Sequence, residues 1–240
     1  MYRFQSYFFS SLLLLSLLTA CKPTSSVEPD QNETPAPESA APGFGTSKSR
    51  PEGTPFVFPA GISLVKKPSA DADCWSETRK TKKIRGSGGA VAFCLTFSNT
   101  NAYPVRVELP PGLIWVAEES LIDQEFSQNG VLLKTVTVLV PAHAVETTWL
   151  VAYCLNHDRG ITRTGDTFEA QPVLSSHPGL LDLARQLSTR KINEDEYPTE
   201  PTLAERQQLA FVQVAANDVQ HYGTVQASTQ RFLNELPHSK

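Results

Sequence analysis

The sequence lacks a hydrophobic run long enough to cross a bilayer as a helix. Its longest apolar run, residues 8–18, is shorter than the roughly 20 residues that a spanning helix needs. One positive charge, Arg3, precedes the run, and small residues follow it up to Ala20. This order of charge, apolar run and small residues is typical of a signal peptide. We therefore expect residues 1–20 to be a signal peptide.

The sequence also lacks a basic excess and a phosphate-binding loop. Its 21 Lys and Arg residues face 25 Asp and Glu residues, which gives a net charge of -4. Such a balance does not favour the nucleic-acid backbone, so no nucleic-acid partner is expected. The glycines of residues 86–89 lack the spacing and the following Lys-Ser/Thr of a phosphate loop, and they indicate a hairpin turn instead. No cofactor is expected.

The end of the apolar run, Leu18-Thr19-Ala20-Cys21, resembles the lipobox of bacterial lipoproteins. In that family the cysteine thiol receives a diacylglyceryl group before the signal peptide is cut in front of it. The resemblance implies lipidation of Cys21 and a cell-envelope protein anchored to the membrane by its lipid. Lys22 follows, and in such lipoproteins a residue other than Asp there implies the outer membrane of a cell with two membranes. An ordinary secretory signal is the alternative.

Residues 21–55 are poor in apolar side chains and rich in Pro, Ser, Thr, Glu and Ala. A segment of this composition buries too little surface to offset the entropy lost on ordering. We expect a disordered tether with a reach of roughly 30 Å as a coil. The globular domain is then expected over residues 56–240.

The first half of that domain has the pattern of short strands. Apolar and polar residues alternate in short runs, and Gly, Pro and Asn separate the runs. These runs are residues 90–97, 105–109, 112–117, 131–140 and 146–154. They predict an antiparallel β-sandwich over residues 56–160, for which an immunoglobulin-like arrangement is one candidate.

After residue 160 the apolar residues recur at helical spacing. Thr202 and Glu205 form a capping-box pair that opens a helix ending near Gly223, and a further short helix stops at Pro237. The middle of the longer helix is apolar on nearly all sides, so a central position is expected. The predicted class is α+β, with residues 161–240 mainly helical.

Cysteine is scarce, and its number constrains the pairing. If Cys21 carries lipid, the folded part holds Cys74, Cys94 and Cys154, an odd number in a compartment that permits disulfides. We predict a Cys74–Cys94 disulfide, which leaves Cys154 free. Pairing of Cys94 with Cys154 is the alternative, and it would leave Cys74 beside Trp75.

Two short motifs carry the functional hypothesis. Tyr153-Cys154-Leu155-Asn156 closes the last strand-like run, and Phe211-Val212-Gln213-Val214 lies in the longer helix. The pair resembles the thioester domains of bacterial surface adhesins, over residues 149–219. The sequence departs from that family at Val214, where a polar residue is preferred, and at Ala216-Asn217, where an aromatic residue is frequent.

The resemblance implies a bond between the Cys154 sulfur and the side-chain carbonyl of Gln213. A primary amine on a host or neighbouring-cell surface protein would open this thioester and become covalently attached, so the chain would be an adhesin and not an enzyme. Tyr153, Asn156 and His157 are the supporting candidates, with His157 assisting proton transfer.

Four other interpretations compete with the thioester. Cys154 can be a buried core residue with Gln213 a solvated helix position, or a hydrolase nucleophile with His177 or His221 as base. A zinc site would need Cys154, His157 and ligands such as His143, but no second compact ligand pair exists, so no metal is expected. The last is a non-enzymatic lipoprotein whose sandwich binds protein or glycan non-covalently through loops.

Overall fold

The computed structural model describes residues 41–118 and 125–239. The expected signal peptide, the lipidation candidate Cys21 and most of the tether lie outside these residues. Within the described part of the chain, no helix combines the length and the apolar character that a membrane crossing requires.

The strands are short except for the two that form the middle of the sheet. The described residues contain β1 (Gly53–Pro55), β2 (Ile62–Leu64), β3 (Ile84–Gly86), β4 (Val91–Asn99), β5 (Val105–Leu109), β6 (Leu113–Trp115), β7 (Gly130–Val131), β8 (Val136–Val140), β9 (Val145–Cys154) and β10 (Val173–Ser175). They form a curled eight-stranded sheet of order β1-β10-β6-β7-β9-β4-β2, with β3 parallel to β9, and a two-stranded sheet of β5 and β8.

Strand β9 organises the sheet because it pairs with three other strands. On one edge β4 runs antiparallel to it, with pairs from Ser98 opposite Val145 to Val91 opposite Ala152. On the other edge β3 is followed by β7, which places Gly130 opposite Cys154. Cys154 therefore lies two residues beyond the last residue of β9 that β4 covers.

Alternation along β9 divides its side chains between two cores. Leu150, Ala152 and Cys154 contribute to the core between the strands. Tyr153 and Leu155 belong to the core that the sheet shares with the C-terminal helices. Because successive strand residues point to opposite faces, the thiol and its two neighbours lie on opposite sides of the sheet.

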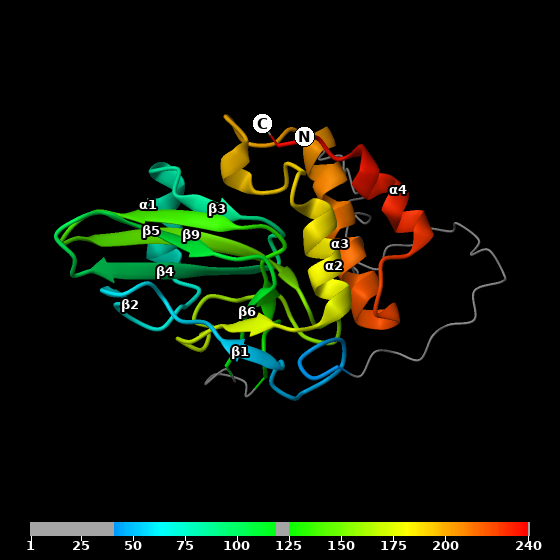
Figure 1. Ribbon diagram of the computed structural model, residues 1–240, viewed down its shortest axis with the longest axis horizontal. Coiled ribbons are helices and arrows are strands. Elements are labelled where there is room, and N and C mark those ends of the chain that lie inside the picture. The colour runs from blue at the N-terminus through cyan, green and yellow to red at the C-terminus, as the bar shows by residue number, and fades with distance from the viewer. Residues whose placement is uncertain (1–40, 119–124, 240) are drawn as a thin grey trace, which may run out of the picture. The chain divides into compact units, whose positions relative to one another are not determined.

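The helices begin and end where the sequence supplies capping residues. The described helices are α1 (Ala72–Lys80), α2 (Pro178–Leu187), α3 (Leu203–Tyr222) and α4 (Ala227–Glu235), with a short 3₁₀ helix, η1 (Glu194–Glu196). Thr202 and Glu205 form the predicted capping box of α3, and Gly223 ends it with a left-handed φ of 73°. Figure 1 shows α2, α3 and α4 side by side at one end of the strands.

The predicted α+β class is confirmed, but the immunoglobulin-like sandwich is not, since the strands pair as one curled sheet beside a two-stranded one. Two elements fall outside the predicted division: α1 lies among the strands, and β10 lies in the part expected to be mainly helical. Helix α3 is buried along one side only, and Val214 on its outer side is 42% exposed. A run of Val and Ala does not show which side of a helix meets the core.

Residues 41–55, assigned above to the tether, lie against the folded part. Phe44 is 2% exposed and stacks on His177, with ring centroids 4.7 Å apart. Strand β1 pairs with β10. Residues 41–55 therefore belong to the folded part, because one buried aromatic ring and a short strand hold an otherwise polar segment.

Candidate functional site

The side-chain amide of Gln213 lies against one edge of β9 at Cys154, where no strand of the described residues pairs with that edge. The Cys154 N–H donates to Oε1 of Gln213 (2.8 Å), and Nε2 of Gln213 donates to the Cys154 carbonyl oxygen (3.1 Å). This is the pattern that a neighbouring strand would make, at the position where β4 has ended. The structure thus brings the two members of the predicted pair together, through the main chain of one and the side chain of the other.

Two residues that the sequence analysis missed complete this contact. Asn217 Oδ1 accepts from Gln213 Nε2 (2.9 Å), and Gln220 Nε2 donates to the Cys154 carbonyl oxygen (2.8 Å). Gln220 Nε2 is also 3.3 Å from Asn217 Oδ1. Positions 213, 217 and 220 are spaced i, i+4 and i+7, so they share one face of α3. This stripe of polar residues on an otherwise apolar helix is the sequence signal that could have identified Asn217 and Gln220.

The Cys154 thiol is buried and unpaired. It forms no disulfide and is 7% exposed. Burial raises the pKa of the thiol to about 12, because the interior solvates a thiolate poorly. A hydrolase nucleophile needs the opposite shift, a pKa lowered by a neighbouring base. The environment of Cys154 therefore disfavours the Cys-His hydrolase interpretation.

The Tyr153 side chain lies on the helix side of β9, opposite to the Cys154 thiol. Its ring belongs to the core formed with the helices, and its hydroxyl is 2.6 Å from the Ser87 hydroxyl, which donates to it. Burial raises the pKa of Tyr153 well above its ordinary value. The side chain therefore stays neutral and acts as a fixed apolar wall on the helix side of β9.

Asn156 anchors the segment that precedes the fold. Its Nδ2 donates to the carbonyl oxygens of Gly43 (3.1 Å) and Gly45 (3.3 Å), and its Oδ1 accepts from the Asn129 N–H (3.0 Å). Asn156 is fully buried. The polar residue of the cysteine motif thus joins the motif to residues 43–45 and to the turn before β7.

The histidines considered in the sequence lie in three different places. His157 is exposed and packs against His221 at the end of α3, with ring centroids 4.6 Å apart. His177 caps α2, its Nδ1 accepting from the Leu180 N–H (3.3 Å). His143 precedes β9 and is separated from Cys154 by the length of that strand, about 30 Å. Within residues 41–118 and 125–239, no cluster of three or more His, Cys, Asp or Glu is arranged to hold a metal ion.

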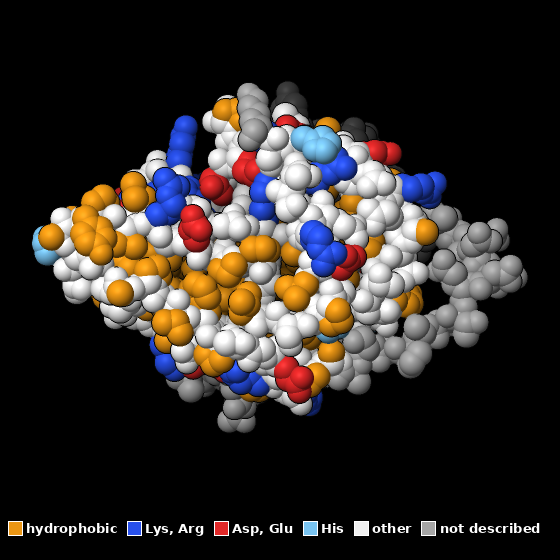
Figure 2. Space-filling model, viewed as in Figure 1, with side chains coloured by type: hydrophobic (Ala, Val, Ile, Leu, Met, Phe, Trp, Pro, Cys, Tyr) orange, Lys and Arg blue, Asp and Glu red, His pale blue; other side chains and the backbone are white. Residues whose placement is uncertain are grey.

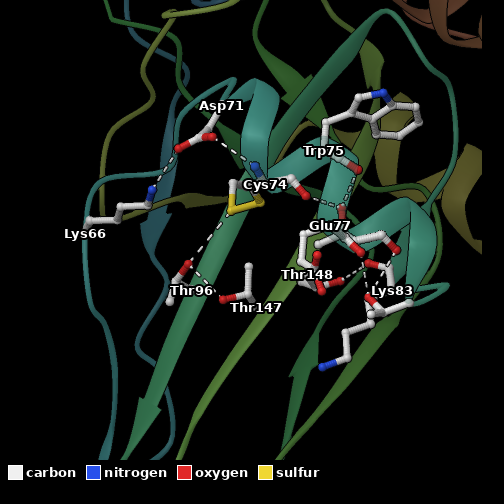
Figure 3. Close-up of a disulfide and its surroundings, with 12 residues drawn as sticks. Lys66, Asp71, Cys74, Trp75, Glu77, Lys83, Thr96, Thr147 and Thr148 are labelled. Carbon is white, nitrogen blue, oxygen red and sulfur yellow. Dashed lines mark hydrogen bonds and ion pairs between the residues drawn. A yellow bond between two sulfur atoms is a disulfide. The ribbon is translucent and has the colours of Figure 1, made fainter.

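The predicted disulfide between Cys74 and Cys94 is present and joins α1 to β4. The two Cα atoms are 6.2 Å apart. Figure 3 shows the bond beside Asp71, which caps α1 by accepting from the Cys74 N–H (2.9 Å). Because this pair is closed, Cys154 is the free cysteine among the described residues, in agreement with the predicted pairing.

A pocket of about 510 Å³ opens beside the disulfide-linked helix. Trp75 and Trp149 line it with ring centroids 5.3 Å apart, and Trp75 is 37% exposed. Arg79 lies over the Trp75 ring. Arg206, on the first turns of α3, lines the same pocket. Arg206 and Gln213 are seven residues apart, so about 10 Å of helix separates the pocket from the Cys154 site.

Comparison of the chain with protein-family models, with curated proteins and with solved structures finds no match.

Proposed function

We propose that this protein is an envelope lipoprotein that attaches covalently to a target through an internal thioester between Cys154 and Gln213. The observation that carries the proposal is the paired hydrogen bonding between the Gln213 amide and the Cys154 main chain. A sulfur attacking an unactivated amide needs the two groups to be held together, which converts a bimolecular encounter into an intramolecular step.

The position of the amide relative to the sheet defines the movement that attack by sulfur requires. Both polar atoms of the Gln213 amide bond the edge of β9, so the amide lies close to the plane of the sheet. Side chains of a strand stand roughly perpendicular to that plane. The Cys154 thiol therefore stands to one side of the amide plane, and bond formation requires its side chain to turn about χ1 toward the carbonyl carbon. The Cys154 N–H, already bonded to Oε1, would stabilise negative charge that develops on that oxygen.

Each of the two proposed steps, thioester formation and aminolysis, includes one proton transfer. The Cys154 thiol adds to the Gln213 carbonyl carbon, its proton passes to Nε2, and ammonia leaves. A primary amine of the target then adds to the same carbon, its proton passes to the departing sulfur, and an amide and a free thiol result. Burial favours the neutral forms of sulfur in this cycle, the thioester and the thiol.

The envelope location follows from the lipobox resemblance at Cys21. A lipid on Cys21 would anchor the chain, in the outer membrane if the cell has two membranes. The target would be a protein amine on a host or neighbouring cell. A covalent bond suits an anchored adhesin because its lifetime does not depend on a dissociation rate.

Intact mass spectrometry of the purified protein, before and after methylamine treatment, tests the thioester. The expected mass is lower than the sequence mass, corrected for processing and lipid, by one ammonia, and methylamine should add once, at Gln213. Cys154→Ala should abolish both effects, whereas Gln230→Ala, a glutamine on α4, should preserve both. An unmodified wild-type mass with no methylamine uptake would exclude the proposal.

Non-covalent binding through the Trp75 pocket is the second candidate, and the exposed indole favours it. Figure 2 shows apolar side chains in a broken band across one face, from the strand part into the helical part. Exposed apolar surface of this kind frequently marks a binding site for protein or glycan. Binding that survives Cys154→Ala but is lost in Trp75→Ala would support this candidate over the thioester.

A further inference from the structure

The polar stripe on α3 contains more hydrogen-bonding groups than are needed to hold Gln213. Gln213 Nε2 donates to two oxygens, those of the Cys154 carbonyl and the Asn217 side chain. Gln220 Nε2 donates to the same two oxygens. Gln220 is 1% exposed, and its Oε1 is a buried acceptor without a hydrogen-bond partner in the structure. A buried acceptor without a partner costs free energy in this state, and a ligand that donates a hydrogen bond to it would remove that cost.

We propose that Asn217 and Gln220 form the site through which ammonia leaves and the target's primary amine enters, an inference that rests on the proposed thioester. Attack of ammonia on the thioester is the exact reverse of thioester formation. By microscopic reversibility, the groups that hold Nε2 as it departs also hold an incoming amine nitrogen. The nitrogen position is defined by Asn217 Oδ1 and the Cys154 carbonyl oxygen.

Two acceptors at this position match a primary amine. The amine uses its lone pair on the carbonyl carbon and has two N–H bonds for the two oxygens. A target hydroxyl has only one O–H bond, so it would bond one of the two acceptors and leave the other with the Gln220 donor alone. The stripe therefore favours lysine-type amines over the hydroxyls of serine or of a glycan.

Asn217 keeps its bond to the nitrogen throughout the cycle. Of the two hydrogens on Gln213 Nε2, the one that bonds the Cys154 carbonyl lies on the same side of the C–N bond as Oε1. After aminolysis the amide is secondary and prefers the trans form, in which the substituent of the amine replaces this hydrogen. The remaining hydrogen is the one that Asn217 accepts. Asn217 thus contacts the leaving ammonia, the attacking amine and the product amide.

Gln220 supports the Cys154 carbonyl when the nitrogen departs. Once ammonia has left, that oxygen loses the hydrogen bond from Gln213 and keeps the one from Gln220, at 2.8 Å. Its free Oε1 provides an additional acceptor for ammonium or amine hydrogens. Gln220 is therefore a positioning residue, whereas Asn217 contacts the reacting nitrogen.

The site is accessible from the outer side of the helix. Gln213 and Asn217 are partly exposed, Val214 beside them is exposed, and Gln220 closes the inner end. An amine on a flexible side chain can reach the nitrogen position from solvent, while the sulfur stays buried.

The test compares aminolysis with hydrolysis of the thioester in the full-length protein. Methylamine is the probe, and mass spectrometry measures the ratio of methylamide to carboxylate at position 213. Asn217→Ala should lower this ratio by about 10- to 100-fold, as expected for one hydrogen bond to a reacting group. Asn217→Asp, which retains an acceptor oxygen, should restore most of it. A purely structural role would slow both reactions or neither.

Asn234→Ala is the matched control. Asn234 accepts from Gln230 (3.2 Å) at the same i, i+4 spacing on α4, but on the surface. The ratio of methylamide to carboxylate in Asn234→Ala should equal that of the wild type. Gln220→Leu, which retains the volume but not the donor, should reduce the fraction of chains that form the thioester.

The outcomes separate this inference from the proposed function. A wild-type protein with no ammonia loss and no methylamine uptake overturns both. A wild-type thioester with an unchanged ratio in Asn217→Ala overturns only the amine site. If Asn217→Ala fails to form the thioester, Asn217→Asp decides: restored formation supports the acceptor role, and continued failure shows that the assignment is wrong.

Discussion

The Gln213 amide occupies, beside Cys154, the place that β4 would occupy if it extended two residues beyond Val91. Its Oε1 and Nε2 are 2.8 and 3.1 Å from the Cys154 nitrogen and carbonyl oxygen. A side chain thus completes the sheet where a strand has ended. The contact both holds α3 on β9 and places a carbonyl beside the residue that carries a buried thiol.

The first prediction concerns the stabilising role of this contact in the absence of any cross-link. In a Cys154→Ser background, Gln213→Ala should destabilise the fold by about 1 kcal/mol, since two hydrogen bonds are lost at a partly exposed edge. Urea unfolding measures the change. In the same Cys154→Ser background, Gln230→Ala should change the free energy of unfolding by no more than about 0.5 kcal/mol. Equal effects of the two variants would show that the Gln213 contact does not stabilise α3 on β9.

The second prediction is a pH dependence caused by the buried thiol. The pKa of the Cys154 thiol is about 12 in the folded protein, against about 8.5 when unfolded, and Gln213→Ala, which cannot form the thioester, leaves this thiol free to titrate. Stability is therefore fully present below the unfolded pKa and is lost as pH rises toward the folded value. Between pH of about 8 and about 10 the loss should be about 1 to 2 kcal/mol.

Urea unfolding at the two pH values measures this slope, and adding Cys154→Ser should remove it. Iodoacetamide should alkylate Cys154 slowly in the folded Gln213→Ala protein and rapidly in urea. Rapid alkylation of the folded protein would show that the thiol is not buried in solution.

The third prediction concerns the Cys74–Cys94 disulfide. The bond closes a loop with a sequence separation of 20 residues, so the double variant Cys74→Ala with Cys94→Ala should lose about 3 kcal/mol. Helix α1 buries little besides Thr78, so it should detach, which a red shift of tryptophan fluorescence would report. A non-reducing peptide map that joined Cys94 to Cys154 would contradict both the structure and the thioester.

The fourth prediction concerns the segment held by Asn156. Asn156→Ala removes the donor to Gly43 and Gly45, so the buried Gly45 carbonyl oxygen loses its bond while that of Gly43 keeps only the one from Asn129 Nδ2. We expect a loss of roughly 2 kcal/mol or more and faster proteolysis within residues 41–50. Asn234→Ala, at an exposed position, should change neither property. Unchanged protection of residues 41–50 in Asn156→Ala would mean that Phe44 and the remaining hydrogen bonds, such as that of the Gly45 N–H to the Leu155 carbonyl oxygen, fix the segment without Asn156.

The sequence by itself determined the features that depend on local pattern. Alternation placed the strands around residues 91–99 and 145–154, and the capping pair of Thr202 with Glu205 placed the start of α3. The count of cysteines, with Cys21 set aside, showed that one of Cys74, Cys94 and Cys154 stays free, and the predicted Cys74–Cys94 pairing is the one that the structure contains. Each of these follows from the residues themselves and their near neighbours, so no knowledge of the fold was required.

Only the tertiary structure decided how those elements meet. The end of β4 at Val91 left the edge of β9 free at Cys154, and α3 turned the face that carries Gln213, Asn217 and Gln220 toward it. The curled sheet and the position of Phe44 likewise depend on contacts between distant parts of the chain. Hydrophobic periodicity assigns a residue to a strand or a helix, but it does not specify which edges and faces come together, because that depends on packing over the whole core.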